Sequence, residues 1–271
     1  MRGIEYLSST PKYNLLYDAL GWERPIYIHM PPIMKDAQHK LSKRNGDASY
    51  EDLLKKGFLK DAIINYIALL GWSPKDDSEK MSFEELQQKF DISGINKSPS
   101  IFDPVKLTWL NSLYIKEMTP DAFADYAKPW IEGCYLKDFD LDLVCKLLQP
   151  RVETFAQIPE MLDFLVDYTE FDCELYFNKK QKTDAAQAKD ILPLVKQTLE
   201  TVAEWNNASL YQALVDLATA QGIKNGKVLW PARIALTGRA STPGGASEVA
   251  ELLGKEETLR RLDLALAMLN K

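Results

Sequence analysis

The 271-residue sequence is poor in the side chains that build metal centres and disulfide frameworks. It contains three cysteines, Cys134, Cys145 and Cys173, and two histidines, His29 and His39. The cysteines are far apart and form no CxxC pair, so the close ligand pairs of structural zinc sites are missing. Isolated thiols in odd number are typical of a reducing compartment. We therefore expect a cytoplasmic protein with inert, mostly buried cysteines and no structural metal.

Long apolar stretches are also missing. No run of 18 apolar residues occurs, and the N-terminus has no apolar core of a secretory signal, so no membrane span and no secretion are expected. Hydrophobic residues make up 46% and charged residues 27%, which excludes collagen, coiled-coil arrays and wholesale disorder. A chain of this length predicts about two domains with a sizeable core.

The net charge of -6 argues against a nucleic-acid ligand, but its distribution along the chain is uneven. Residues 117–176 hold 14 acidic and 4 basic side chains, a net of -10, whereas residues 221–271 hold 8 basic and 5 acidic ones, a net of +3. A partner responds to the local potential. If the partner is RNA, we expect the acidic block to face away from it, and residues 40–60 and the C-terminal segment to face it.

The first 48 residues predict a small α/β unit. Thr10 as N-cap, Pro11 in the first turn and Gly21 as terminator predict a helix. Residues Ile26–Ile28 predict a short strand that Pro31 and Pro32 stop. The expected buried stripe of the helix consists of Leu15, Leu16, Ala19 and Leu20. One helix and one strand do not make a domain, so this segment is the end of a larger α/β unit or a cap on a helical body.

From residue 49 onward the pattern is helical almost everywhere, which predicts a mainly α fold. Start signals are Ser49, the Ser82–Glu85 capping box, Asp103 before Pro104 and Thr119 before Pro120. Residues 59–70 put Leu59, Ile63, Ile64, Ile67 and Leu70 on one apolar face. The best later strand candidate is 227–236, which alternatively starts a helix at Pro231, and Pro193 is expected to kink or restart a long helix. Expected linkers are 72–81, 91–100 and 178–184.

Residues 40–46 (KLSKRNG) are the most informative stretch. Two lysines and an arginine stand within five residues, between an apolar strand and a helix. Ammonium groups and backbone amides of such a loop can stabilise the charge of a polyphosphate. From the residues alone, a solvated basic turn is the alternative.

KLSKR resembles the KMSKS loop of class I aminoacyl-tRNA synthetases in its glutamyl form. Other segments match the same family in the same order: RGIE at 2–5, STP at 9–11, ALGW at 19–22, HMP at 29–31, NYIALLGW at 65–72, KLTWLN at 106–111, PARIALTG at 231–238 and ELLGK at 251–255. This colinear set resembles the C-terminal part of a bacterial glutamyl-tRNA synthetase. Two departures are Ile4, where the family has an acidic residue, and the absence of a HIGH-like element and the first Rossmann strands.

The resemblance implies three regions. Residues 1–48 would be the C-terminal remnant of a Rossmann catalytic domain, 49–115 a helical stem-contact region and 116–271 an all-helical anticodon-binding domain. The helical third region distinguishes the chain from glutaminyl relatives, whose anticodon domains are β-barrels.

The resemblance also implies roles for the basic loop and the N-terminus. Lys40 and Lys43 would be catalytic and, with Ser42 and Arg44, would bind ATP. Arg2 would bind the carboxylate of glutamate, for which its fork-shaped guanidinium is suited. A disordered terminus is the alternative for Arg2.

The resemblance also implies tRNA contacts. Lys106 and Asn111 would orient the acceptor arm, with capping or surface roles as the alternative; for the neighbouring Trp109, a core position is the stronger alternative. The anticodon would be read by Arg151, Arg233 and Arg239, with Leu252 and Leu253 as the floor of the pocket. An ion pair with Glu153 or another carboxylate is the alternative for Arg151, and a core position is the alternative for both leucines.

The implied function is ATP-dependent glutamylation of tRNA, with Mg²⁺ in the complete enzyme. Its partners would be the glutamate tRNA and possibly the glutamine tRNA. The protein would be a monomer and would not contact a membrane. Without the HIGH-containing half, the chain is expected to bind tRNA but not to activate glutamate alone. A standalone RNA-binding adaptor and a purely structural helical scaffold are the alternatives.

Overall fold

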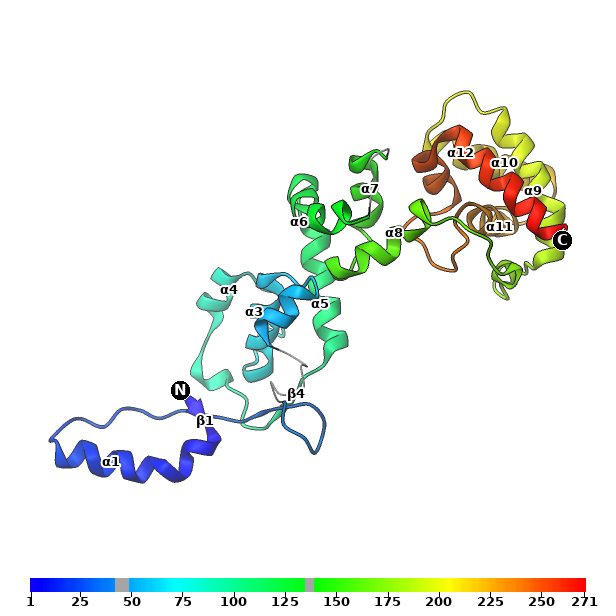
Figure 1. Cartoon of the computed structure of the whole chain (residues 1–271). Coiled ribbons are helices and arrows are strands. Elements are labelled where there is room, and N and C mark those ends of the chain that lie inside the picture. The colour runs from blue at the N-terminus through cyan, green and yellow to red at the C-terminus, as the bar shows by residue number, and fades with distance from the viewer. Residues whose placement is uncertain (42–48, 135–138) are drawn as a thin grey trace. The chain divides into compact units, whose positions relative to one another are not determined.

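Figure 1 shows a computed structural model of the chain, which describes residues 1–41, 49–134 and 139–271. The chain divides into two units. The first contains residues 1–117 and 153–156, and the second contains 118–152 and 157–271. The boundaries expected at residues 48 and 115 stay predictions. The mainly helical fold with a few short strands is as predicted.

The first unit begins with a parallel pair of strands joined by a helix. The elements are β1 (Arg2–Gly3), the 3-10 helix η1 (Ile4–Ser9), α1 (Thr10–Ala19) and β2 (His29–Met30). Arg2 pairs with His29 in parallel register. A crossover helix between parallel strands is the arrangement of α/β domains, so the α/β character predicted for this segment is confirmed.

Three local predictions for this segment are wrong. The strand lies at His29–Met30 rather than 26–28, and Ile26 is 92% exposed. The N-cap of α1 is Ser9, because Thr10 is already helical and donates its hydroxyl to Tyr6 O. The predicted stripe is not buried; Leu15, for example, is 69% exposed, and no residue of α1 is buried. An apolar stripe is buried only where a second layer covers it. Gly21, with φ +66°, ends the helix as predicted.

In the described part of the first unit, four α-helices, one 3-10 helix and two short parallel strands follow. They are β3 (Ile33–Met34), α2 (Tyr50–Lys55), α3 (Lys60–Gly71), α4 (Phe83–Lys89), η3 (Ile92–Gly94), β4 (Ser100–Ile101) and α5 (Pro104–Glu117). The predicted caps are confirmed: Ser49 accepts from Asp52 N, Ser82 and Glu85 form a capping box, and Asp103 accepts from Val105 N.

The core of this unit lies between α3 and α5. Ile63, Tyr66 and Leu110 are almost fully buried there. Ile67, expected on the same apolar face, is instead 50% exposed, because the face that meets α5 is narrower than the apolar pattern. The segment 72–81 is not a free linker, since Trp72 and Met81 at its ends are buried against Leu86 of α4.

A short segment from the middle of the chain completes the first unit. Phe155 is 2% exposed and donates its backbone N–H to Gly57 O at 3.1 Å. The buried amide of Asn111 accepts from Leu59 N at 2.8 Å and donates to Glu153 O at 2.5 Å. Residues 153–156 are therefore tied to α2, α3 and α5.

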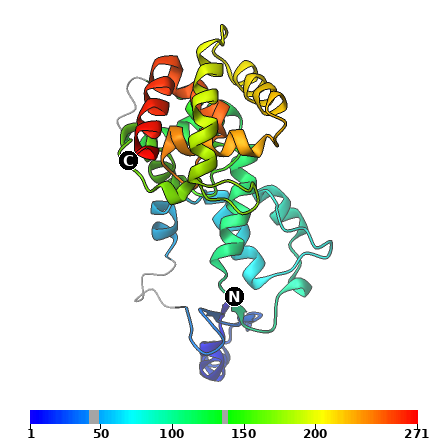
Figure 2. The same ribbon diagram turned by 90° about the vertical axis from the view of Figure 1, so that its right-hand side faces the viewer.

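The second unit is helical. Its elements are α6 (Pro120–Glu132), α7 (Leu141–Leu148), α8 (Ile158–Val166), η5 (Cys173–Tyr176), α9 (Ala185–Glu200), α10 (Asn207–Ala220), α11 (Gly226–Thr237) and α12 (Ala246–Leu269). The 3-10 helix η4 (Phe155–Gln157), which begins in the first unit, precedes α8. Thr119 caps α6 as predicted. Helices α9 to α12 pack on one another in a cluster that is visible in both views (Figures 1 and 2).

Proline and glycine positions shape this cluster. Helix α11 begins at Gly226 and contains Pro231, so the strand alternative for 227–236 is wrong and the helix starts earlier than Pro231. Pro193 lies inside α9, which continues through it. Gly254, with φ +76°, interrupts the helical backbone of α12. Among the described helices, none is both long enough and apolar enough to cross a membrane.

A buried guanidinium joins three helices of the second unit. Arg261 of α12 is 2% exposed and donates to Phe164 O and Leu236 O, at the C-terminal ends of α8 and α11. Its Nε donates to Glu257 at 2.7 Å, and its Cζ lies 4.4 Å from the centre of the Tyr168 ring. A cation at helix C-termini is stabilised by the helix dipoles as well as by these hydrogen bonds.

Candidate nucleic-acid interface

Arg151 stands just beyond the C-terminal end of α7. The buried side chains of Leu147 and Leu148 hold this end of the helix, and Arg151 N donates to Leu148 O at 2.9 Å. The guanidinium donates through Nη1 to Leu147 O at 3.0 Å. Its Nη2 lies 3.0 and 3.2 Å from the two carboxylate oxygens of Glu248. The side chain remains 37% exposed, so a ligand can still approach it.

Glu248 binds two groups: the backbone at the start of α12 and the guanidinium of Arg151. Its Oε2 accepts the backbone N–H of Gly245, the N-cap residue, at 2.7 Å. A carboxylate in the first turn of a helix is favoured by the helix dipole. The sequence left an ion pair with Glu153 or another neighbouring carboxylate open for Arg151. The observed partner is 97 residues away in sequence, on another helix.

Arg233 of α11 is held against the segment that leads into α12. Its Cζ lies 4.5 Å from the centre of the Trp230 ring, and its Nη2 donates to Ala240 O at 2.8 Å. Its Nη1 lies 3.4 Å from Thr242 Oγ1, and that hydroxyl donates to Gly244 O at 2.8 Å. Burial lowers the pKa of Arg233. The arginine therefore fixes the segment that leads to Gly244 and Gly245 before α12.

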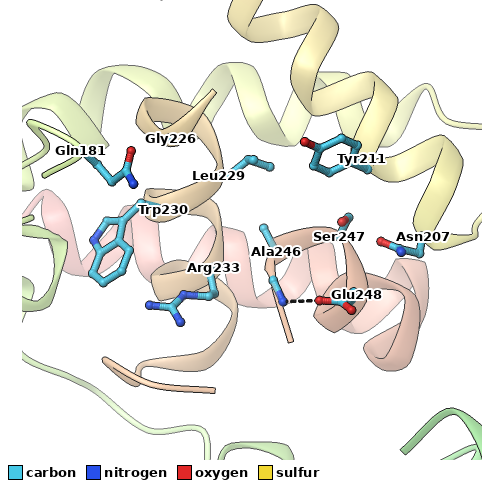
Figure 3. Close-up of a pocket in the computed structure, with 11 residues that line it drawn as sticks. Gln181, Asn207, Tyr211, Gly226, Leu229, Trp230, Arg233, Ala246, Ser247 and Glu248 are labelled. Carbon is cyan, nitrogen blue, oxygen red and sulfur yellow. Dashed lines mark hydrogen bonds between the residues drawn. The ribbon is translucent and has the colours of Figure 1, made fainter. Parts of the chain in front are cut away.

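A cavity of about 430 Å³ lies between α10, α11 and the start of α12. Figure 3 shows that aromatic, amide, hydroxyl and charged groups surround it. Asn207 Oδ1 in its lining is buried without a hydrogen-bond partner in the described structure. Flat aromatic faces beside mixed donors and acceptors suit a nucleobase. The lining residues are Gln181, Asn207, Tyr211, Gly226, Leu229, Trp230, Arg233, Gly245, Ala246, Ser247 and Glu248.

Arg239 follows the left-handed Gly238 that ends α11, and its side chain turns toward α8. Its Nε and Nη2 each lie 3.0 Å from Asp163 Oδ2, and Nη2 lies 3.9 Å from Asp167. Arg151 is thus paired with Glu248 of α12, and Arg233 lines the cavity that Glu248 also lines, whereas Arg239 is paired with carboxylates of the acidic block. Basic residues of the C-terminal segment therefore pair with the acidic block, and the expected separation of acidic and basic surfaces is incomplete. Lys271, for example, also pairs with Glu170.

The two leucines expected at the floor of the pocket do not line the cavity. Leu252 and Leu253 are 7% and 8% exposed and belong to the core, because the first turns of α12 present residues 245–248 to the cavity instead. This is the alternative that their helical spacing left open.

In the first unit, the predicted tRNA contacts lie in different surroundings. Lys106 Nζ forms a surface ion pair with Glu79 at 2.6 Å. Trp109 is 41% exposed, so it is not the core residue that the alternative described. Asn111 is fully buried, and its acceptor caps the backbone of α3 at Leu59. Asn111 therefore has the capping role that the sequence offered as an alternative. Its buried side chain cannot contact an RNA.

The expected substrate residues are only partly described. Lys40 is exposed and lies opposite Met34 in an antiparallel bridge. Ser42, Lys43 and Arg44 lie outside the described residues. Arg2 is half-buried, and its guanidinium lies 4.5 Å from the Tyr6 ring centre and 4.8 Å from that of Tyr13.

The three cysteines are half-buried rather than mostly buried. Burial raises the pKa of each thiol, with a smaller contribution from neighbouring carboxylates at Cys145 and Cys173. A raised pKa leaves little thiolate at neutral pH, which fits the unreactive role expected for them.

Sequence reasoning missed Trp230, Tyr211 and Glu248. The signal for Trp230 was present in WPAR, because residues three apart share one helix face and a cation can then lie over the ring. That relation was hidden while 227–236 was interpreted as a strand or as a helix starting at Pro231. The pairing of Glu248 with Arg151 spans too much sequence for any local pattern to indicate it.

Two family models match the chain. Residues 122–266 match the family described as "Anticodon binding domain", and residues 1–109 match "tRNA synthetases class I (E and Q), catalytic domain". The helical second unit with its arginines and aromatic cavity thus falls in the class of anticodon binding domains. The chain belongs to the anticodon binding domain family, and the predicted resemblance to glutamyl-tRNA synthetases is confirmed.

Similar proteins agree with this assignment. The chain is 50% identical over 269 residues to a glutamate–tRNA ligase of Clostridium tetani and 47% identical over 272 residues to that of Clostridium acetobutylicum. It covers 55% and 56% of those proteins, so the chain spans about half the length of the curated relatives it matches.

Solved structures show the same relation. A glutamate tRNA ligase of Elizabethkingia meningosepticum, crystallised in complex with its amino acid, has a TM-score of 0.82 at 26% identity. The glutamate-tRNA synthetase of Elizabethkingia anophelis has a TM-score of 0.81 at 27% identity. In each case 98% of this chain and 56% of the other chain are covered.

Proposed function

We propose that this chain is the tRNA-binding part of a glutamate–tRNA ligase, which uses the cleavage of ATP to AMP and pyrophosphate to esterify tRNA with glutamate. The observation that carries the proposal is the placement of Arg151 and Arg233 on either side of Glu248, inside the matched residues 122–266: Arg151 pairs with Glu248, and Arg233 lines the same cavity as Glu248. Relatives named glutamate–tRNA ligase match along nearly the entire chain, which favours a ligase over a standalone adaptor.

In this proposal the second unit reads the anticodon. Single-stranded bases are recognised when they splay out, stack on aromatic rings and meet donors and acceptors. The guanidinium of Arg151 and the Trp230–Arg233 stack offer such contacts beside the cavity. Arg239 has an indirect role, because its ion pairs with α8 hold the segment after α11.

The first unit serves the other end of the tRNA and the reaction. Exposed Trp109 and the ion-paired Lys106 offer a surface on α5 for the acceptor arm. Lys40 and, outside the described residues, Ser42, Lys43 and Arg44 would hold the ATP phosphates, and Arg2 would bind the glutamate carboxylate. The whole protein would form glutamyl-adenylate and pyrophosphate, and then transfer the glutamyl group to tRNA.

Mg²⁺ would reach the reaction with the ATP phosphates. The described residues gather no set of three carboxylate, imidazole or thiolate groups that could hold a metal ion. Selection of the glutamate tRNA, acceptance of the glutamine tRNA, the monomeric state and the cytoplasmic location stay predictions.

A binding experiment tests the proposal. The 271-residue chain is titrated with a glutamate tRNA transcript and with the same transcript carrying a changed anticodon, over a salt series. We expect binding that weakens as the salt concentration rises. The anticodon change should weaken the binding free energy by about 1–3 kcal/mol. Equal binding of both transcripts would contradict anticodon reading. ATP–pyrophosphate exchange by these 271 residues alone is expected to be absent.

Arg151→Ala and Arg260→Ala form the matched pair for this test. Arg260 is an exposed arginine of α12 whose partner is Glu257, so its removal changes the net charge equally. Arg151→Ala should cost about 1–3 kcal/mol with the original transcript and little with the changed one. Arg260→Ala should affect both transcripts alike.

A further inference from the structure

Glu248 places a negative charge inside the basic, aromatic site, where a polyanionic ligand would be expected to meet cations only. Its carboxylate lines the cavity together with Arg233 and lies 3.0 Å from Arg151. Capping of the helix does not require this charge, because a neutral glutamine can also accept the Gly245 N–H at this position of a capping box.

We infer that Glu248 is a specificity-determining residue, which makes the Arg151 site accept the edge of a nucleobase and reject a backbone phosphate. This inference rests on the proposed tRNA-binding function. It adds to that function a residue whose role is to disfavour the binding of a phosphate at Arg151, in addition to any favourable contact with a base.

The geometry gives the reason for this selection. A guanidinium by itself binds phosphate well, since its N–H fork matches phosphate oxygens. A phosphate on Arg151 would stand within a few bond lengths of the Glu248 carboxylate, and the two negative charges would repel each other. A nucleobase carries no net charge, and its edge offers N–H groups beside acceptor atoms. The paired Arg151 donor and Glu248 acceptor therefore match a base edge without either losing its charge partner.

The exposure of the pair permits such a contact. The side chains of Arg151 and Glu248 are 37% and 28% exposed, so each is open to a ligand on one side. The hydrogen bond from Arg151 Nη1 to Leu147 O, at 3.0 Å, orients the guanidinium from the protein side. The other face of Glu248 meets the cavity, where Trp230 and Tyr211 provide stacking surfaces (Figure 3).

The test compares Glu248→Gln with Glu256→Gln. Both variants remove one negative charge from α12, but Glu256 lies on its exposed surface. Each is titrated with the glutamate tRNA transcript and with the anticodon-changed transcript over a salt series. With Glu248→Gln, a phosphate of the changed transcript can occupy Arg151. We expect about five-fold tighter binding of that transcript and a salt slope steeper by about one, while the original transcript changes less.

Each outcome then decides the inference. It is overturned if Glu248→Gln shifts both transcripts by the same factor as Glu256→Gln, or weakens both equally. Failure of the proposed function looks different, because then the unchanged protein itself does not bind the glutamate tRNA transcript or does not distinguish the two.

A conservative variant separates charge from shape. Glu248→Asp keeps the negative charge and shortens the side chain by one methylene. It should retain the original discrimination and salt slope, whereas equal loss of discrimination in the Asp and Gln variants would show that the charge of Glu248 does not set the selection and would overturn the inference. Unfolding midpoints of all variants check that the helix start is intact.

Discussion

At the scale of single residues, Arg261 is the charge on which the second unit depends. Replacing it by alanine leaves the carbonyls of Phe164 and Leu236 without their buried donor, whereas Glu257 keeps Arg260 as a partner. Each lost hydrogen bond to a charged group costs about 1.5–3 kcal/mol, so Arg261→Ala should lower the free energy of unfolding by about 3–5 kcal/mol. Urea unfolding of the full chain measures it.

The neighbouring Arg260 provides the control for this prediction. It pairs with the same Glu257 but is 52% exposed. Exposed pairs contribute about 0–1 kcal/mol, so Arg260→Ala should change the unfolding free energy by no more than that. Similar losses for both arginines would show that burial does not decide the contribution.

Tyr114 gives the first unit a dependence on alkaline pH. Its hydroxyl lies 2.6 Å from Met81 O and 2.8 Å from Asn65 Oδ1. Burial, and then the charge of Asp61, raise the pKa of Tyr114 to about 12. Because the folded protein holds this proton more tightly than the unfolded chain, the stabilisation is present below pH 10 and is lost as the pH rises through 12.

The measurement for Tyr114 is urea unfolding between pH 9 and about pH 11. Tyr114→Phe removes the titrating group, so its unfolding free energy should fall less steeply over this range than that of the unchanged protein. Parallel curves for the two proteins would contradict the assignment. Other buried tyrosines, such as Tyr168, contribute equally to both curves and cancel in the comparison.

At the scale of elements, the turn after α2 shows how closely two segments meet. Gly57 has φ +77°, and a Cβ there would lie 2.5 Å from Ala156 N. Gly222 after α10 has φ +63°, but a Cβ there meets nothing within 4 Å. Gly57→Ala should cost about 2–4 kcal/mol from strain and overpacking together, and Gly222→Ala about 1 kcal/mol from strain alone.

Thermal and urea unfolding of the two alanine variants measure this difference. The comparison holds the backbone conformation constant and varies only the space around the new methyl group. Equal costs would mean that residues 155–156 shift without penalty, and that they do not fix the turn.

Elements with local start signals were predictable from the sequence, and elements that depend on a second layer were not. The caps at Ser49, Ser82 and Thr119 are local hydrogen bonds, and each was predicted correctly. Burial of the α1 stripe depends on what packs against it, so Leu15 could not be placed from its spacing alone. Proline was misleading in α11, because the bulk of Pro231 suggested a boundary inside a continuous helix.

The same distinction applies to the site. Arg151 and Arg233 were selected through the family resemblance, and the structure brings both to the start of α12. The pairing of Arg151 with Glu248 and the burial of Asn111 depend on contacts 97 and 52 residues apart. Such contacts follow from tertiary packing, and no spacing rule reaches them.

At the scale of the whole molecule, the two units should unfold as separate cooperative bodies, because each has its own core. We expect two urea transitions by circular dichroism. Gly57→Ala should move only the transition of the first unit, and Arg261→Ala only that of the second. A single transition that both variants shift alike would show that the units unfold together.

The position of residues 153–156 has a consequence for synthesis of the chain on the ribosome. These residues follow α6 and α7 in sequence but complete the first unit through Phe155 and Glu153. Translation proceeds at about 5–20 residues per second, so α2, α3 and α5 emerge seconds before the segment that closes on them. The first unit therefore waits, with its turn at Gly57 open, until part of the second unit has already left the exit tunnel.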